Sequence, residues 1–132
     1  MLTKAIIDEQ ALEVYSVENK CAIQFNEKGD SKLLSIPYPC GFVRASKEKV
    51  VQTHYYKGIG HVLVVAGPPA DKTAYRGDVG VSPEHMCSNH GQAIILDKGE
   101  IILRKAQQVP LGFCHYLGFD EKVFYGYAYP ID

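Results

Sequence analysis

The chain has 132 residues, of which 46% are hydrophobic and 22% are charged, and its formal net charge is -1. A chain of this length can bury roughly two thirds of the surface that its unfolded form exposes, so we expect a single globular domain. The small net charge gives no long-range attraction for nucleic-acid phosphates, and no apolar run is long enough to cross a bilayer. We therefore expect neither a nucleic-acid partner nor a membrane partner.

The four cysteines lie far apart in the sequence and in apolar surroundings. They are Cys21, Cys40, Cys87 and Cys114. The apolar block at the N-terminus is too short for the hydrophobic region of a secretory signal, which predicts a cytoplasmic location. Because that compartment keeps thiols reduced, we expect free and mostly buried cysteines in place of disulfides.

The first third of the chain predicts an antiparallel meander. Short segments that favour strands, Ala11–Val17, Cys21–Asn26 and Lys32–Ile36, are separated by turn residues. An alternative places a short helix from Asp8 through Glu13, because an aspartate can cap a helix start. Periodicity over so few residues does not separate these two readings.

Two interpretations are open for the segment after the prolines at 37 and 39. In the first, Ser46 caps a helix that ends at Gly58. The apolar stripe of that helix would be Val50, Val51, His54 and Tyr55. In the second, Lys57–Gly60 is the turn of a hairpin. In both, the apolar run His61–Ala66 is a central strand with both faces covered.

A loop and a helix start are predicted next. Gly67–Val81 contains two consecutive prolines and three glycines. A loop of about fifteen residues in a compact domain is usually functional or mobile. Ser82, Pro83 and Glu84 are a hydroxyl cap, a proline in the first turn and an acid, which together favour a helix that ends at Gly91.

The last third of the chain predicts four strands. Gln92–Leu96 and Glu100–Arg104 form a hairpin around a glycine-containing turn, and Leu111–Leu117 and Lys122–Tyr129 follow. These elements predict an α+β fold, a mostly antiparallel sheet of short strands with one to three short helices on one side. An all-β barrel or sandwich is the alternative.

One candidate site centres on Cys87. A thiol near a helix N-terminus and beside imidazoles would have the environment of a reactive thiolate. His90, His61 or His115 could act as its base, which would give a small cysteine-dependent hydrolase or transferase. A metal site would need further ligands such as Cys114, and the chain has no second pair of ligands at a familiar spacing, so we expect neither metal nor cofactor.

A second candidate site uses the tyrosines near the C-terminus. On a strand, Tyr125 and Tyr127 would share one face, and tyrosine suits a wet pocket or a partner surface. The candidate ligand-binding residues are Arg76, Asp78, Asn89, Tyr125 and Tyr127. We favour a non-enzymatic binding or interaction domain that holds a small ligand or forms a homodimer through this strand and the 67–81 loop.

Overall fold

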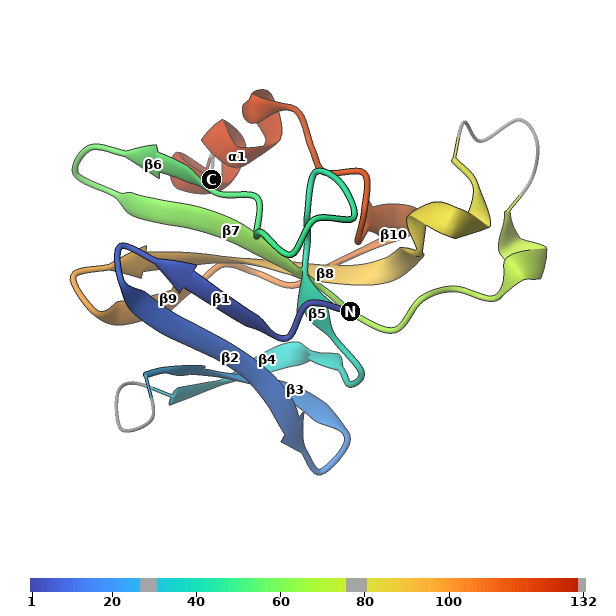
Figure 1. The fold of residues 1–132 in the computed structure, drawn as a ribbon, viewed down its shortest axis with the longest axis horizontal. Coiled ribbons are helices and arrows are strands. Elements are labelled where there is room, and N and C mark those ends of the chain that lie inside the picture. Colours follow the sequence, from blue (N-terminus) through green and yellow to red (C-terminus); the bar gives the residue numbers. More distant parts are fainter. Residues whose placement is uncertain (27–30, 76–80, 131–132) are drawn as a thin grey trace.

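The structure is a computed structural model that describes residues 1–26, 31–75 and 81–130. Two antiparallel sheets face each other, and the helix α1 (Glu121–Ala128) lies beside β6 and β7 of the second sheet (Figure 1). The first sheet contains, in spatial order, β1 (Lys4–Ile7), β2 (Gln10–Val17), β3 (Lys20–Phe25) and β4 (Ser31–Pro37). The second sheet contains β5 (Gly41–Phe42), β6 (His54–Tyr56), β7 (Gly60–Ala66), β8 (Cys87–Asp97), β9 (Glu100–Leu103) and β10 (Gln107–Cys114).

The order of the second sheet is β10-β8-β7-β5, with β6 paired to β7 and β9 paired to β8. The expectation of mostly antiparallel sheet with few helices is confirmed, and the two facing sheets also fit the sandwich named as the alternative. The described strands form two open sheets and not a closed barrel.

Tight turns explain why the local hairpins follow from the sequence. Asp8 and Glu9 both have positive φ and join β1 to β2, and Glu18 and Asn19 join β2 to β3 in the same way. Two-residue turns of this conformation match the twist of antiparallel strands. The meander is therefore confirmed and gains β1 at its edge, whereas the alternative helix after Asp8 is wrong.

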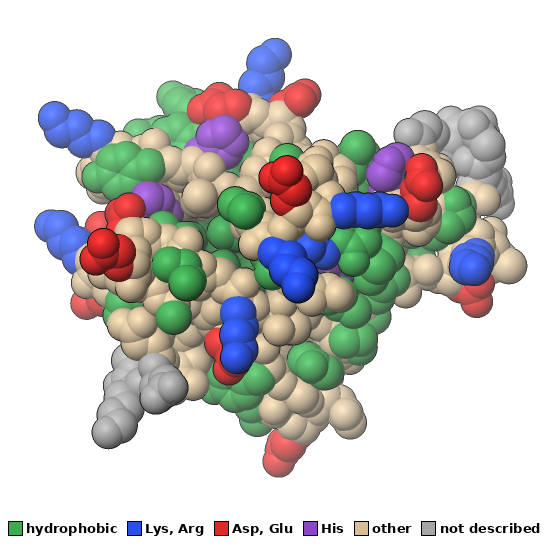
Figure 2. Space-filling view, viewed as in Figure 1, with side chains coloured by type: hydrophobic (Ala, Val, Ile, Leu, Met, Phe, Trp, Pro, Cys, Tyr) green, Lys and Arg blue, Asp and Glu red, His purple; other side chains and the backbone are tan. Residues whose placement is uncertain are grey.

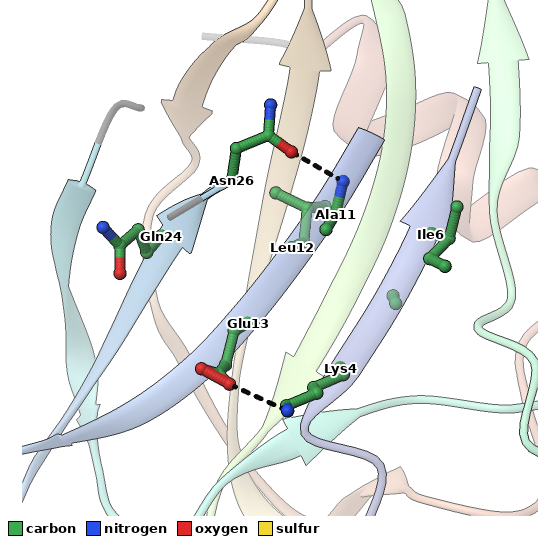
Figure 3. A pocket seen from close by; sticks show the side chains of 8 residues that line it. Lys4, Ile6, Ala11, Leu12, Glu13, Gln24 and Asn26 are labelled. Carbon is green, nitrogen blue, oxygen red and sulfur yellow. Dashed lines mark hydrogen bonds and ion pairs between the residues drawn. The ribbon is translucent and has the colours of Figure 1, made fainter. Parts of the chain in front are cut away.

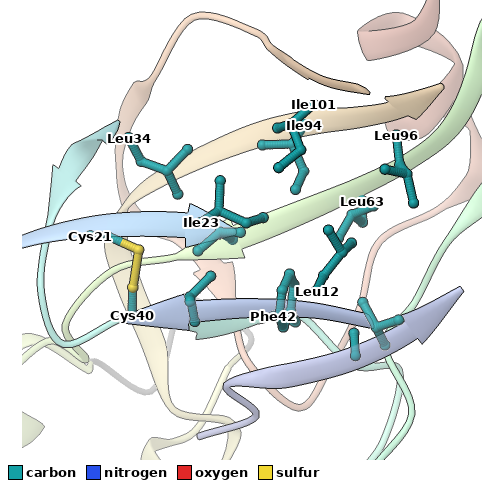
Figure 4. Close-up of a cluster of buried hydrophobic side chains, with 14 of the residues drawn as sticks. Leu12, Cys21, Ile23, Leu34, Cys40, Phe42, Leu63, Ile94, Leu96 and Ile101 are labelled. Carbon is teal, nitrogen blue, oxygen red and sulfur yellow. A yellow bond between two sulfur atoms is a disulfide. The ribbon is translucent and has the colours of Figure 1, made fainter. Parts of the chain in front are cut away.

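The main core fills the space between the two sheets. Buried aliphatic side chains from β2, β3 and β4 meet those from β7, β8 and β9 there (Figure 4). Those drawn and labelled in the figure include Leu12, Ile23, Leu34, Leu63, Ile94 and Ile101. A disulfide between Cys21 and Cys40 lies at one end of this cluster and joins β3 to the segment before β5.

A second core lies between the other face of the second sheet and α1. Along β7, Leu63 and Val65 belong to the main core, while Val62 and Val64 belong to the second one. The helix contributes Phe124, which is fully buried. The prediction of a central strand covered on both faces is confirmed, since alternate residues of β7 face two different apolar layers.

Two neighbouring residues of β8 have specific contacts. Gly91 lies beneath the ring of Phe113, and a Cβ atom built on it would be 2.2 Å from that ring. Gln92 is only 3% exposed, and its side chain accepts a hydrogen bond from the Ser35 amide at 2.7 Å and donates one to the Arg104 carbonyl at 2.8 Å. This amide therefore connects β4 of the first sheet to the segment after β9.

The helix predicted from Ser46 is not present. Residues 45–49 form a series of bends without helical hydrogen bonding, and the alternative hairpin is the correct one, with β6 paired to β7 through His54↔Val62. Gly58 has φ +82, which suits the turn. Pairing with the buried strand β7 and the β-branched residues of the segment outweigh its weak helical pattern.

The helix predicted after Ser82 is also wrong. Only Pro83–His85 form a single 3-10 turn, and Met86, with φ 50, ends it in the left-handed conformation. From Cys87 onward the chain pairs with both β7 and β10. The cap residues predict the turn correctly, but the long strand that follows depends on partners that are distant in sequence.

The strand predicted at Lys122–Tyr129 is a helix, α1. Phe124 and Ala128 are four residues apart and both buried, as on the inner face of a helix. The strand predicted at Leu111–Leu117 is displaced toward the N-terminus, because β10 ends at Cys114.

The expectation of free thiols is wrong, since all four cysteines form disulfides, Cys21 with Cys40 and Cys87 with Cys114. In the parts of the chain that the structure describes, no helix has the length and apolar character needed to cross a membrane.

Candidate functional site

Cys87 begins β8 and lies directly opposite its disulfide partner Cys114 in β10. The Tyr75 hydroxyl bridges the backbone of Cys87, because it accepts from the Cys87 amide at 2.6 Å and donates to the Cys87 carbonyl at 3.1 Å. The sulfur of Cys87 is therefore bonded, buried and next to a tethered loop. Its use as a nucleophile would require reduction of this disulfide.

His115 is the predicted base that directly follows a disulfide cysteine, Cys114, in the sequence. Its Nε2 atom is 3.1 Å from both the Ser88 hydroxyl and the Gly67 carbonyl, and the same hydroxyl donates to that carbonyl at 2.7 Å. Because a carbonyl only accepts, these contacts assign the proton to Nε2. Burial lowers the pKa of His115 to about 4, so the ring is neutral at physiological pH.

The other two predicted bases are placed differently. His61 pairs with Leu96, nine residues along β8 from Cys87, a separation of about 30 Å at the usual rise of a strand. Its Nε2 atom is 2.8 Å from a carboxylate oxygen of Asp8. His90 is three residues from Cys87 on one strand, which places the two side chains on opposite faces. The His115 ring bonds to Ser88, whose side chain lies on the opposite face of β8 from that of Cys87. The structure therefore does not bring any of these three imidazoles together with the sulfur.

The predicted ligand-binding residues do not converge. Arg76 and Asp78 lie outside the described residues. Asn89 accepts a hydrogen bond from the Leu111 amide at 2.9 Å and so supports the irregular part of β10. On α1, Tyr125 is exposed, whereas Tyr127 is half-buried.

The Tyr127 hydroxyl donates to the Gln107 side chain at 2.8 Å, and burial raises its pKa. The expected homodimer through Tyr125 and Tyr127 stays a prediction. Within residues 1–26, 31–75 and 81–130, no group of three or more His, Cys, Asp or Glu side chains is arranged to hold a metal.

Two hollows on the surface differ in their charge. The first, of about 290 Å³, lies on the β1–β2–β3 part of the first sheet (Figure 3). Its lysine and its glutamate, Lys4 and Glu13, form an ion pair at 3.6 Å, and Asn26 accepts from the Ala11 amide at 3.0 Å. The charges of this hollow are therefore already paired with each other.

The second hollow is a groove of about 410 Å³ between α1 and the segment that joins β9 to β10. It is lined by Arg104, Lys105, Gln107, Lys122, Val123, Gly126, Tyr127 and Pro130. We call it the basic groove, because three of these side chains are cationic and no described acidic side chain lines it. Elsewhere, on the face shown in Figure 2, acidic and basic side chains are interspersed.

Arg104 has a structural role at one wall of the basic groove. Its Nε atom donates to the Tyr127 carbonyl at 2.7 Å, and one terminal nitrogen donates to the Ala128 carbonyl at 3.3 Å. These bonds satisfy carbonyls at the C-terminal end of α1, where a cation is favoured by the helix dipole. The guanidinium is therefore held in a fixed orientation beside the groove.

The sequence reasoning missed this groove because it treated 122–129 as a strand. On α1, Lys122 and Gly126 are four residues apart and lie along one side, and Pro130 follows the end of the helix. That spacing is the signal that was available in the sequence.

No family model matches the chain, and no curated protein and no solved structure matches it.

Proposed function

We propose that the protein binds a small organic anion in the basic groove between α1 and the β9–β10 connection. The observation that carries this proposal is the convergence of Arg104, Lys105 and Lys122 on one hollow that no described carboxylate lines. This assigns the binding function expected from the sequence to a particular site, near the tyrosine-rich C-terminal segment.

The cations of the groove are available to a ligand. Neither Lys105 nor Lys122 forms an ion pair with any part of the chain that the structure describes, and both are exposed. Arg104 keeps one terminal nitrogen, Nη1, that makes no hydrogen bond to a described residue. A guanidinium that is already fixed loses little conformational freedom when it binds a carboxylate or a phosphate.

The remaining lining residues fit the organic part of the ligand. Val123 and Pro130 are apolar, and nothing lies within 4 Å of a Cβ atom built on Gly126, so the helix surface there is open. Gln107 adds a side-chain amide. A volume of about 410 Å³ lies within the usual range of small-molecule sites, which combine apolar surface with a few polar groups.

Titrations followed by NMR of the ¹⁵N-labelled protein would test this proposal, with phenyl phosphate, benzoate and the neutral benzyl alcohol as probes. We expect the two anions to shift amide signals around the groove saturably, and benzyl alcohol to shift them much less. Binding should also weaken as salt is added, because the contacts are partly exposed.

A charge-reversal pair provides the decisive comparison. Lys105→Glu with Lys122→Glu should weaken anion binding by about tenfold or more. The matched control is Lys20→Glu with Lys98→Glu, with the same change in net charge. Both lysines are exposed and neither lines the groove: Lys20 begins β3, and Lys98 is on the turn between β8 and β9. Equal loss in both double variants, or equal binding of benzyl alcohol and the anions, would contradict the proposal.

The two disulfides also support a location in an oxidising compartment instead of the expected cytoplasm, because disulfides are rare where glutathione and thioredoxin keep thiols reduced. Alkylation of the protein directly in its native cells, before lysis, tests this location. Blocked cysteines support an oxidising compartment, and full alkylation of all four would support the cytoplasm.

A further inference from the structure

Three tyrosine rings from two elements meet on the surface beside α1. The centroid of Tyr56, from β6, lies 6.0 Å from that of Tyr125 and 5.9 Å from that of Tyr129. The Tyr125 and Tyr129 centroids are 4.8 Å apart. We call these three rings the tyrosine cluster, and it shares no residue with the basic groove.

A carboxylate belongs to the same surface. Glu121, Tyr125 and Tyr129 follow one another at a spacing of four, which places them along one side of the helix. The Tyr56 hydroxyl donates to Glu121 Oε1 at 2.5 Å. Burial, together with this hydrogen bond, raises the pKa of Tyr56 to about 12, so the hydroxyl stays a neutral donor to the carboxylate.

No cation of the described chain occupies the cluster. Tyr125 is 55% exposed and Tyr129 is 42% exposed, so a large part of each side chain is accessible to solvent. Among the described residues, the cation found over an aromatic ring is Arg44, at 4.4 Å from the Tyr116 centroid. The exposed parts of Tyr125 and Tyr129 are therefore open to a cation from outside.

The arrangement favours a cation over a neutral apolar group. A tyrosine face carries the negative part of the ring quadrupole and attracts a cation within about 6 Å of its centroid. The Tyr125 and Tyr129 centroids are 4.8 Å apart and both side chains are exposed, so a cation that docks on one of these rings lies close to the other. The Glu121 carboxylate adds a Coulombic attraction at the edge.

We propose that the tyrosine cluster and Glu121 bind a quaternary ammonium group. A quaternary ammonium group has no N–H group, so its binding breaks no N–H hydrogen bond to water. Its methyl groups pack directly on aromatic rings. A free alkylammonium compound and the trimethylated lysine of a protein present the same chemistry to this surface.

The test is a titration of the ¹⁵N-labelled protein with choline and with its neutral isostere, 3,3-dimethyl-1-butanol. We expect saturable shifts at Tyr56, Tyr125 and Tyr129 with choline and at least about fivefold weaker binding of the neutral compound. Tyr125→Phe keeps a ring and should retain binding, whereas Tyr125→Leu should lose about fivefold or more. Glu121→Gln should weaken choline binding and leave that of the neutral compound unchanged.

Tyr55→Leu is the matched control, because Tyr55 is exposed on the same strand as Tyr56 but is not part of the cluster. Equal binding of choline and its isostere, or an undiminished affinity in both Tyr125→Leu and Glu121→Gln, would overturn the proposal. If Tyr125→Leu does not fold, the Glu121→Gln comparison decides.

Peptides that contain trimethyllysine or unmodified lysine then distinguish the source of the cation. Tighter binding of the trimethylated peptide than of choline indicates a protein partner, and tighter binding of choline indicates a free compound. Equal affinity of the two peptides, without preference for the methylated one, would contradict a quaternary ammonium site.

Discussion

Removal of either disulfide should lower the stability of the protein by a large and similar amount. The perturbations are the paired substitutions Cys21→Ala with Cys40→Ala, and Cys87→Ala with Cys114→Ala. Each pair removes a covalent link between segments that are distant in sequence, so the unfolded chain regains conformational freedom.

The magnitude follows from the lengths of the closed loops. The bonded cysteines are 19 residues apart in the first disulfide and 27 residues apart in the second. Loop-closure entropy for such lengths corresponds to about 3 to 4 kcal/mol for each link, slightly more for the longer loop. Since a domain is typically stable by about 5 to 15 kcal/mol, each double variant should fold, and the quadruple variant should lose about 7 kcal/mol.

Urea unfolding followed by far-ultraviolet circular dichroism measures this loss, and we expect a midpoint lower by about 2 M in each double variant. Alkylation in denaturant provides the control for bond formation, because the wild-type protein should react only after reduction. Reaction of the unreduced wild-type cysteines, or a change below about 1 kcal/mol in both double variants, would refute this reasoning.

Three further predictions concern single residues. Gly91→Ala should destabilise the protein by about 1 to 3 kcal/mol, because the new methyl group meets a buried ring. Gly126→Ala lies in an open part of the helix and should stabilise the protein by about 0.5 to 1 kcal/mol. Thermal unfolding of both variants checks this, and equal effects would contradict it. Because burial lowers the pKa of His115 to about 4 and unfolded histidine titrates near 6.5, the unfolded state binds the extra proton between these pH values, so up to about 3 kcal/mol of stability should be lost as the pH falls from 7 to 4. In His115→Asn this part of the pH dependence should disappear, and an unchanged profile in urea titrations would show that the ring is not the cause. Tyr75→Phe should lose the two hydrogen bonds to the backbone of Cys87 and cost about 1 to 2 kcal/mol, with faster hydrogen exchange at the Cys87 amide; unchanged exchange there would contradict the bridging role.

The correctly predicted elements are those whose information is local. The turns at Glu18 and Lys98 lie within a few residues of the strands that they join, so a short stretch of sequence contains the whole hairpin. The run Val62–Ala66 contains no polar residue, and this predicted its burial on both faces correctly.

The elements that were missed depend on distant partners. Several tyrosines and Gly126 disfavour a helix at 121–128, and the helix is held by burial of Phe124 and by the Arg104 side chain, which comes from about twenty residues earlier. Cysteine positions alone do not determine pairing, so the disulfide between Cys87 and Cys114 could not be predicted from the spacing of the cysteines.

The basic groove could not be predicted for the same reason. Lys105 and Lys122 come together only because α1 packs beside the β9–β10 connection. A strand at the same position would have given an aromatic face and no groove. The sequence shows the helical spacing of Lys122 and Gly126, but it does not show that Lys105 lies across the groove from them.

Burial of β7 and of the middle of β8 on both faces has a consequence for errors in strand pairing. If β8 shifted by one residue against its neighbours, its apolar side chains would move from one apolar layer to the other. The hydrophobic effect would therefore hardly oppose this register shift. Two adjacent residues oppose it. A slip brings a side chain under the Phe113 ring, where Gly91 now lies, and it separates the Gln92 amide from Ser35 and Arg104 and leaves it buried without partners. The alignment of the central strand is thus specified by one missing side chain and one buried amide, while its aliphatic residues supply the driving force for collapse without selecting among alignments.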